Sequence, residues 1–212
     1  MMEKLGVGYL SYRAIAARAE DFFMRLNPTR VIPVPIEEIA EFKLGVNIIP
    51  IPNLQKIFEV EGFISSDLQN IYVDQFILYE RPTRYRFTLA HEIGHIFLHR
   101  FVFEKLKIEF ADDWKRFVEG IDDQERSAME FQGYAFAGLI LVPPKELEAA
   151  VRENMKELHP SIQACMEKDI PREDYLSYAL DRLSATIAPL FDVSTDVIEK
   201  RIGYDKLERM IP

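Results

Sequence analysis

Five residues near the middle of the chain, His91-Glu92-Ile93-Gly94-His95, constrain its fold more than any other feature. They lie inside a largely apolar run from Phe87 to His99. Residues four apart on a helix share one face, so both imidazoles can bind one ion. H-E-x-x-H on a helix is typical of zinc metallopeptidases. We therefore expect His91 and His95 to bind a metal and Glu92 to be catalytic; the alternative is a core helix with two hydrogen-bonded histidines.

A third histidine, His99, lies one turn further along, but its position excludes it as a ligand of the same ion. Positions 91, 95 and 99 rise by about 12 Å along the helix axis, whereas zinc–nitrogen bonds are about 2 Å long. The three-histidine pattern H-E-x-x-H-x-x-G-x-x-H requires Gly and His where this chain has Leu98 and Phe101. We expect His99 to lie at the helix end or to support the ligands from behind.

The composition indicates a folded protein with a substantial core. The 212 residues suffice for one large domain or for one domain with a small appendage, and 48% of them are hydrophobic. A net charge of −9 argues against direct nucleic-acid binding. The single cysteine, Cys165, cannot form an internal disulfide. Because we find neither a secretory signal nor a run of roughly 18 apolar residues, we expect a cytoplasmic protein without a membrane span.

Hydrophobic periodicity predicts an α+β fold that is mainly helical, with a small antiparallel sheet. Thr83 is expected to cap the helix that carries the histidines. We expect strands at residues 46–51, 57–64 and 71–73, the last two forming a hairpin. Predicted helices cover residues 8–26, 36–42, 83–99, 123–141, 145–157 and 171–190, with a short helix around Trp114.

A catalytic zinc normally has three protein ligands and one open position, so a third ligand must come from elsewhere in the chain. The helix predicted over residues 123–141 offers two carboxylates, Glu125 and Glu130. Periodicity and composition leave both possible.

The run from Arg84 to His99 resembles the ImmA/IrrE family of bacterial and phage metallopeptidases, which typically show R-F-T-x-A-H-E-x-G-H. A second family signature, E-x-x-A-x-x-F-A-x-x-L-L-M-P, fits the segment from Glu130 to Pro143, with Gly133 in place of the usual Ala. A frame that begins at Glu125 fails, because Gln132 then falls on an Ala and Gly138 on the Pro. The resemblance therefore implies Glu130 as the third ligand.

The C-terminal run 183–202 is similar to the ending of many family members, in which A-x-x-F-x-V-S is followed after six residues by R-L. It predicts a helix-turn-helix-like segment that turns at residues 192–194. The second helix carries Lys200 and Arg201, but also Asp196 and Glu199. This mixed charge favours a structural or substrate-docking role over DNA contact.

The resemblance implies a zincin-like metallopeptidase domain over residues 1–145 and a helical extension over residues 146–212. It implies that Zn²⁺ is held by His91, His95 and Glu130, with Glu92 as the catalytic base. Characterised family members cleave DNA-binding repressors or regulators, which implies a repressor or antitoxin as substrate and a role in phage, mobile-element or toxin-antitoxin regulation. The alternative is a non-catalytic, zinc-containing toxin-like or regulatory partner that binds a helix-turn-helix protein.

Overall fold

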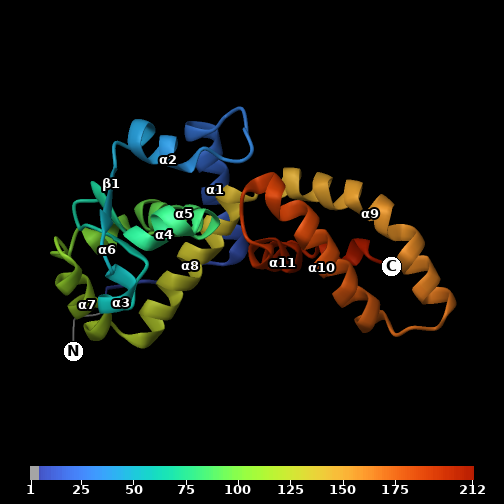
Figure 1. Ribbon diagram of the computed structural model, residues 1–212. Helices are drawn as coiled ribbons and strands as arrows, with labels where there is room; N and C mark the ends of the chain where they lie inside the picture. Colours follow the sequence, from blue (N-terminus) through green and yellow to red (C-terminus); the bar gives the residue numbers. More distant parts are fainter. Residues whose placement is uncertain (1–4) are drawn as a thin grey trace. The chain divides into compact units, whose positions relative to one another are not determined.

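The computed structural model describes residues 5–212. Residues 1–4 lie outside the described residues. The expected first domain begins with these residues, and so does the segment in which we looked for a secretory signal. Contacts between residues divide the chain into two compact units, Met1–Ile140 and Leu141–Pro212 (Figure 1). The sequence predicts the boundary after residue 145, a few residues beyond the division between Ile140 and Leu141. The prediction of a mainly helical α+β fold is confirmed.

The first unit contains a three-stranded sheet in the order β1-β3-β2. Strand β2 (Gly62–Ile64) pairs antiparallel with β3 (Asn70–Asp74), as the predicted hairpin requires. Strand β1 (Asn47–Ile51) pairs with β3 in parallel, so the sheet is mixed and the prediction of a purely antiparallel sheet was wrong. A parallel pair needs a crossover of about a dozen residues or more, and the chain between β1 and β3 supplies it.

The predicted strand over residues 57–64 was too long, because the chain forms the short helix α3 (Leu54–Phe58) there. Both flanking residues, Asn53 and Glu59, have left-handed backbone conformations that begin and end this helix. The backbone N–H of Gln55 donates to the Asp74 carboxylate at 2.9 Å, which ties α3 to the end of β3. These contacts outweigh the β propensity of the local sequence.

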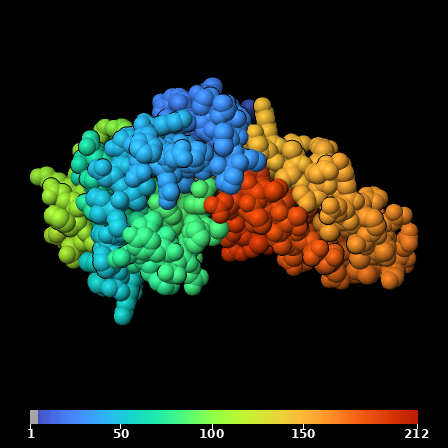
Figure 2. All heavy atoms as spheres, turned by 45° about the horizontal axis from the view of Figure 1, so that its top comes forward, coloured from blue at the N-terminus to red at the C-terminus, as the bar shows by residue number. Residues whose placement is uncertain are grey.

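Helices α4 and α5 pack against the sheet of the first unit, and the blue segment that includes α1 and α2 lies at the top of the space-filling view (Figure 2). Helix α4 was not predicted; the Asp74 carboxylate caps it by accepting from Phe76 N and Ile77 N at 2.9 and 3.1 Å. Besides α3, the helical elements that the structure describes in this unit are α1 (Tyr12–Leu26), α2 (Ile36–Glu38), the π-helical turn η1 (Ile39–Lys43), α4 (Gln75–Glu80), α5 (Pro82–Leu98), α6 (Arg100–Phe103), α7 (Ala111–Gly120) and α8 (Asp123–Leu141).

Helix α5 carries the H-E-x-x-H motif and is buried from Thr88 to Ile96. It begins at Pro82, whose fixed φ suits a first helical position. The cap residue is Arg81, so the expectation that Thr83 caps this helix was wrong. The aromatic ring of Phe22 in α1 packs edge-on against Phe97 and Phe136, at 5.6 and 6.1 Å, and so joins α1, α5 and α8 in one core.

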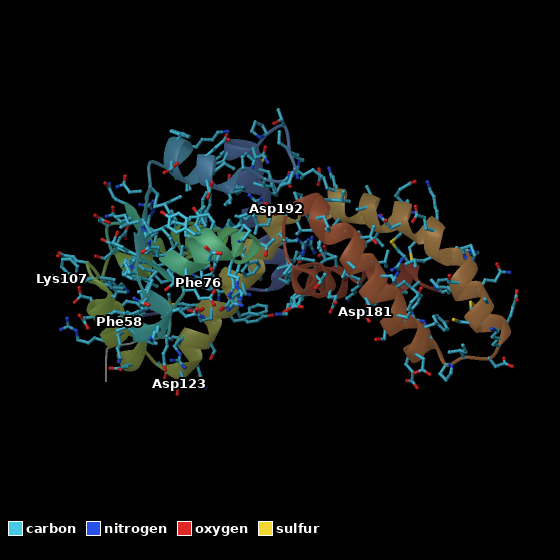
Figure 3. The ribbon with its side chains drawn as sticks, in the orientation of Figure 1. Phe58, Phe76, Lys107, Asp123, Asp181 and Asp192 are labelled. Atoms are coloured by element: carbon cyan, nitrogen blue, oxygen red, sulfur yellow. The ribbon has the colours of Figure 1, made fainter. Side chains whose placement is uncertain are left out.

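The second unit consists of α9 (Pro144–Glu167), α10 (Arg172–Phe191), α11 (Thr195–Tyr204) and the 3₁₀ turn η2 (Leu207–Met210). Helix α10 ends at Asp192, labelled in Figure 3, which takes a left-handed conformation and lets α11 begin three residues later. Arg201 of α11 is 2% exposed; it donates to the Val142 carbonyl and to Asp205 Oδ2. Its guanidinium therefore serves the packing of this unit and is not available to bind DNA. Among the helices of residues 5–212, none is long and apolar enough to cross a membrane.

Candidate metal centre

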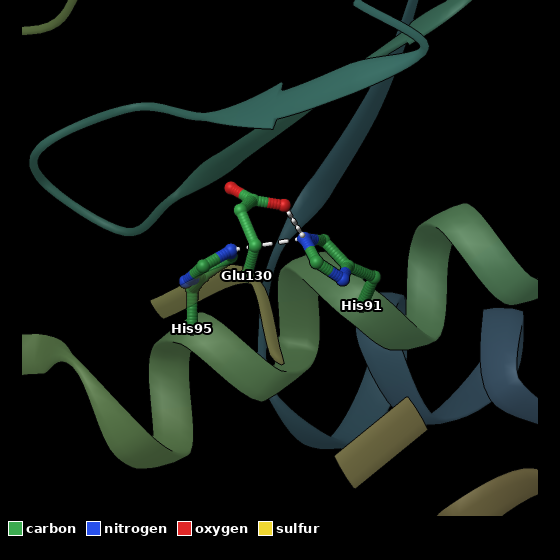
Figure 4. Close-up of side chains that lie close together, drawn as sticks. All are labelled: His91, His95 and Glu130. Carbon is green, nitrogen blue, oxygen red and sulfur yellow. Dashed lines mark hydrogen bonds and ion pairs between the residues drawn. The ribbon is translucent and has the colours of Figure 1, made fainter. Parts of the chain in front are cut away.

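Two neighbouring helices of the first unit bring three predicted ligands together (Figure 4). His91 and His95 project from α5, and their Nε2 atoms lie 3.1 Å apart. Glu130 comes from α8, and its Oε2 lies 3.4 Å from His91 Nε2. One ligand atom from each residue lies within 4.8 Å of the other two. The structure thus gathers residues that the H-E-x-x-H motif and the second signature had indicated separately.

These three side chains fit a zinc ion in both chemistry and spacing. Two imidazoles and one carboxylate are a recognised ligand set of catalytic zinc. Ligand atoms about 2.1 Å from one tetrahedral ion lie about 3.4 Å from each other, and the two separations of 3.1 and 3.4 Å are close to this value. His91 Nδ1 and Glu92 Oε2 are buried without a hydrogen-bond partner among the described residues, which marks an unsatisfied polar centre.

Two glycines allow α5 and α8 to approach closely at this point. A Cβ added to Gly94 would lie 3.3 Å from Phe136 Cδ1 and 3.4 Å from the Cα of Gly133. A Cβ added to Gly133 would lie 2.7 Å from Cε1 of His91, so the imidazole occupies the space that an alanine would fill. Gly94 therefore serves helix packing, and Gly133, which departs from the family signature, gives room to a predicted ligand.

Burial and neighbouring charges set the protonation of the cluster. Burial, with the adjacent His91 and His99, lowers the pKa of His95 well below its usual range. Burial also acts to lower the pKa of His91, but the hydrogen bond to Glu130 and the charges of Glu92 and Glu130 outweigh it, so this pKa is raised. Burial raises the pKa of Glu92 to about 7. A carboxyl group with a pKa near neutrality can both accept and release a proton.

His99 lies at the C-terminal cap of α5 and behind the cluster rather than in it. Its Nδ1 is 2.9 Å from Nδ1 of His95, on the side of that ring that faces away from His91. Its Nε2 is 2.9 Å from Gln132 Oε1 on α8. Burial lowers the pKa of His99 to about 4, so the ring is neutral near pH 7.

Glu125, the other carboxylate that periodicity left possible, is engaged elsewhere. It accepts three backbone N–H groups of the N-terminal segment, from Leu5 at 3.0 Å, Gly6 at 2.7 Å and Val7 at 3.0 Å. The positive φ of Gly6 curls the backbone so that successive N–H groups converge on one carboxylate. These bonds lower the pKa of Glu125. Glu125 therefore anchors residues 5–7 to α8 and does not join the cluster.

The sequence reasoning missed Tyr134, which lies at the edge of the cluster. Its ring centroid is 4.5 Å from that of His91, and its ring stacks on Phe87 at 6.0 Å. Tyr134 is 55% exposed, so it is in contact with solvent as well as with the predicted ligand His91. Tyr134 stands one helical turn after Glu130, and this i, i+4 spacing is the signal that could have identified it.

Two arginines before the motif hold the start of α5 in place. Arg84 forms an ion pair with Glu61, which precedes β2, and Thr88 also donates to Glu61 at 3.3 Å. Arg86 donates to the carbonyl of Val34 at 2.8 Å. Both contacts tie α5 to segments far away in sequence, so this helix is positioned by its neighbours on two sides.

Comparison with known proteins yields one family. The family model described as the IrrE N-terminal-like domain, Peptidase_M78, matches residues 78–203. No curated protein matches the chain. The matched stretch covers more than half of the chain and contains both helices of the cluster, which confirms the resemblance to the ImmA/IrrE family and indicates a metallopeptidase-type domain. The chain therefore belongs to the Peptidase_M78 family of IrrE N-terminal-like domains.

Proposed function

We propose that this protein is a zinc-dependent endopeptidase that cleaves a specific regulatory protein, such as a helix-turn-helix repressor or antitoxin. The observation that carries the proposal is the convergence of His91, His95 and Glu130 beside the buried carboxyl group of Glu92, in a member of a peptidase family. This combination matches the ligand set and the general base of zinc peptidases.

In the proposed reaction, the three ligands hold the ion and Glu92 moves the proton. A bound zinc ion would lower the pKa of a water molecule and polarise the carbonyl group of the scissile peptide. Glu92 takes a proton from the attacking water and delivers it to the amine that leaves. Burial raises its pKa to about 7 in the metal-free protein, and a bound cation would lower this pKa, so the carboxylate is available to accept the proton at neutral pH.

Tyr134 is the residue that we assign to the carbonyl oxygen of the substrate. Its ring lies against His91, and it is half exposed at the edge of the cluster. Burial, together with the negative charges of Glu130, Glu61 and Glu92, raises the pKa of its hydroxyl group. The hydroxyl therefore stays protonated at neutral pH, and it can donate a hydrogen bond to the oxygen on which negative charge develops.

A regulatory DNA-binding protein fits as the substrate on two grounds. Characterised members of the ImmA/IrrE family cleave DNA-binding repressors or regulators. The net charge of −9 on this chain also favours association with a basic partner, because opposite charges speed encounter. The first ground supports a specific protein substrate rather than general digestion, and the second supports a basic one.

The test is to incubate the purified protein with candidate helix-turn-helix proteins, beginning with any that is encoded beside its gene. We expect discrete fragments when zinc is supplied and none after a chelator has removed it, as measured by intact-mass spectrometry. A stable complex without cleavage would contradict the peptidase function and favour a non-catalytic binding partner. Failure of the protein to bind zinc in equilibrium dialysis would contradict both roles of the site.

A further inference from the structure

A continuous series of hydrogen bonds leads from the predicted ligand His95 to the N-terminal segment; it is buried from His95 to Gln132 and partly buried at Gly8. His95 Nδ1 and His99 Nδ1 are 2.9 Å apart, and His99 Nε2 is 2.9 Å from Gln132 Oε1. Gln132 Nε2 then donates to the carbonyl oxygen of Gly8 at 2.8 Å. His99 is 1% exposed and Gln132 is 2% exposed, so the two bonds that His99 makes are shielded from water.

The donor and acceptor of each hydrogen bond in this series follow from the last one, which Gln132 makes to the Gly8 carbonyl. The backbone carbonyl of Gly8 can only accept, so the amide nitrogen of Gln132 faces it and the amide oxygen faces His99. An amide oxygen also only accepts, which places the proton of His99 on Nε2. Nδ1 of a neutral His99 then carries a lone pair, and it must accept from His95.

The proton of His95 is consequently on Nδ1, and its Nε2 carries a lone pair. This lone pair lies 3.1 Å from His91 Nε2, inside the cluster that also contains Glu130. A histidine binds a metal ion through an unprotonated nitrogen, and the hydrogen bond of its other nitrogen selects that form. We propose that His99 and Gln132 are positioning residues that keep His95 Nε2 in the state that binds zinc.

The N-terminal segment completes this arrangement. Glu125 holds the backbone N–H groups of residues 5–7 about two turns before Gln132 on the same helix. This grip fixes the position of the Gly8 carbonyl against Gln132. His91 has no equivalent support, because its Nδ1 is without a partner among the described residues. The N-terminal segment thus supports His95 but not His91.

The inference rests on the zinc site of the proposed function, and zinc affinity is the measurement that tests it. Outer hydrogen-bond partners of metal-binding histidines typically contribute 10- to 100-fold to metal affinity. Competition with a chromogenic chelator at pH 7.5 gives the dissociation constant of each full-length variant. The absorption spectrum of the Co²⁺-substituted protein reports in addition on the geometry of the ligands.

Two substitutions of His99 separate hydrogen bonding from packing. We expect His99→Phe, which keeps an aromatic ring but no acceptor, to weaken zinc binding by about 10- to 100-fold. In His99→Asn the side-chain oxygen can take the place of Nδ1, and we expect an affinity within a few-fold of the wild type. A role in packing alone predicts the reverse order, because the asparagine is the smaller residue. Retention of full affinity in His99→Phe would overturn the proposal.

Gln132→Met provides a second test that preserves side-chain volume. We expect a loss similar to that of His99→Phe, whereas the matched control Gln163→Met, at an exposed position in α9, leaves the affinity unchanged. Thermal unfolding of the metal-free proteins identifies any variant that fails to fold. If one of the His99 variants does not fold, the comparison of Gln132→Met with Gln163→Met tests the inference, and the reverse holds if Gln132→Met does not fold. Unchanged affinity in folded Gln132→Met contradicts the inference alone, whereas absence of zinc binding in the wild type contradicts the proposed function.

Discussion

Gly94 of α5 and Gly133 of α8 face each other where the two helices meet. A Cβ on Gly94 would lie 3.4 Å from the Gly133 Cα, which leaves no room for a larger side chain. Each glycine stands close in sequence to a predicted ligand, since His95 follows Gly94 and Glu130 precedes Gly133 by three residues. The close approach of these two helices is what brings ligands from both of them within reach of one ion.

A larger residue at this meeting point is expected to separate the ligands. Gly94→Val should lower the free energy of unfolding by about 1–3 kcal/mol, because extra methyl groups in a packed core force their neighbours apart. It should also weaken zinc binding. The matched control Gly203→Val places its Cβ in open space within α11 and should change the stability by less than about 0.5 kcal/mol. Urea unfolding measures both effects, and equal values for the two variants would contradict the packing argument.

Glu130 and Glu125 are expected to respond differently to the same substitution. Glu130→Gln removes the anionic ligand from the cluster and should lower zinc affinity by at least about 100-fold. Glu125→Gln leaves the cluster intact and should keep zinc, but it weakens the grip on the backbone of residues 5–7. Zinc content after dialysis distinguishes the two. Loss of zinc from Glu125→Gln but not from Glu130→Gln would show that Glu125, and not Glu130, is the third ligand.

Glu92→Gln tests the proton transfer. The amide keeps the shape of the side chain but cannot accept a proton, so we expect bound zinc and a rate of cleavage reduced by about 10²- to 10⁴-fold. The measurement pairs zinc content with single-turnover cleavage of the helix-turn-helix partner. Cleavage at the wild-type rate would exclude Glu92 as the base.

The same substitution should stabilise the metal-free protein at high pH. Glu92 has a folded pKa raised to about 7 against an ordinary value of 4.5. The folded state therefore binds more protons between these two values, and the wild type loses stability as the pH rises from about 4.5 through about 7. The loss is on the order of 3 kcal/mol, at about 1.4 kcal/mol for each pH unit.

The amide variant does not ionise, so its advantage over the wild type should grow by that amount between pH 4.5 and pH 8. Urea unfolding of both metal-free proteins at these two pH values checks the expectation. A difference in stability that does not change with pH would show that the carboxyl group is not held neutral by burial.

Local sequence signals predicted the helices that carry the site. The boundaries of α8 agree with the predicted helix 123–141, and the H-E-x-x-H motif located His91, Glu92 and His95 on one buried helix. Periodicity alone did not choose between the two glutamates of α8. That choice needed the family signature, because both residues are acidic and lie on the same helix.

The features that escaped prediction depend on contacts between distant segments. The parallel pairing of β1 with β3 is a choice of partner strand, which local periodicity does not encode. Helix α3 depends on the left-handed Asn53 and on a bond to Asp74. The bond from Gln132 to Gly8 joins residues 124 positions apart, and neither has a pattern that indicates the other.

Tyr134 offers a test of how the substrate oxygen is stabilised. Tyr134→Phe removes only the hydroxyl group, and the ring can keep its contacts with His91 and Phe87. We therefore expect unchanged zinc affinity and stability, with kcat lowered by about 10²-fold, the usual effect of losing one donor to a developing oxyanion. Because the pKa of this hydroxyl is raised, the wild-type group stays protonated, and the effect should be the same at pH 7 and pH 9. An unchanged kcat would limit Tyr134 to packing against His91, whereas a loss of zinc would mean that the hydroxyl supports the ligands instead of the substrate.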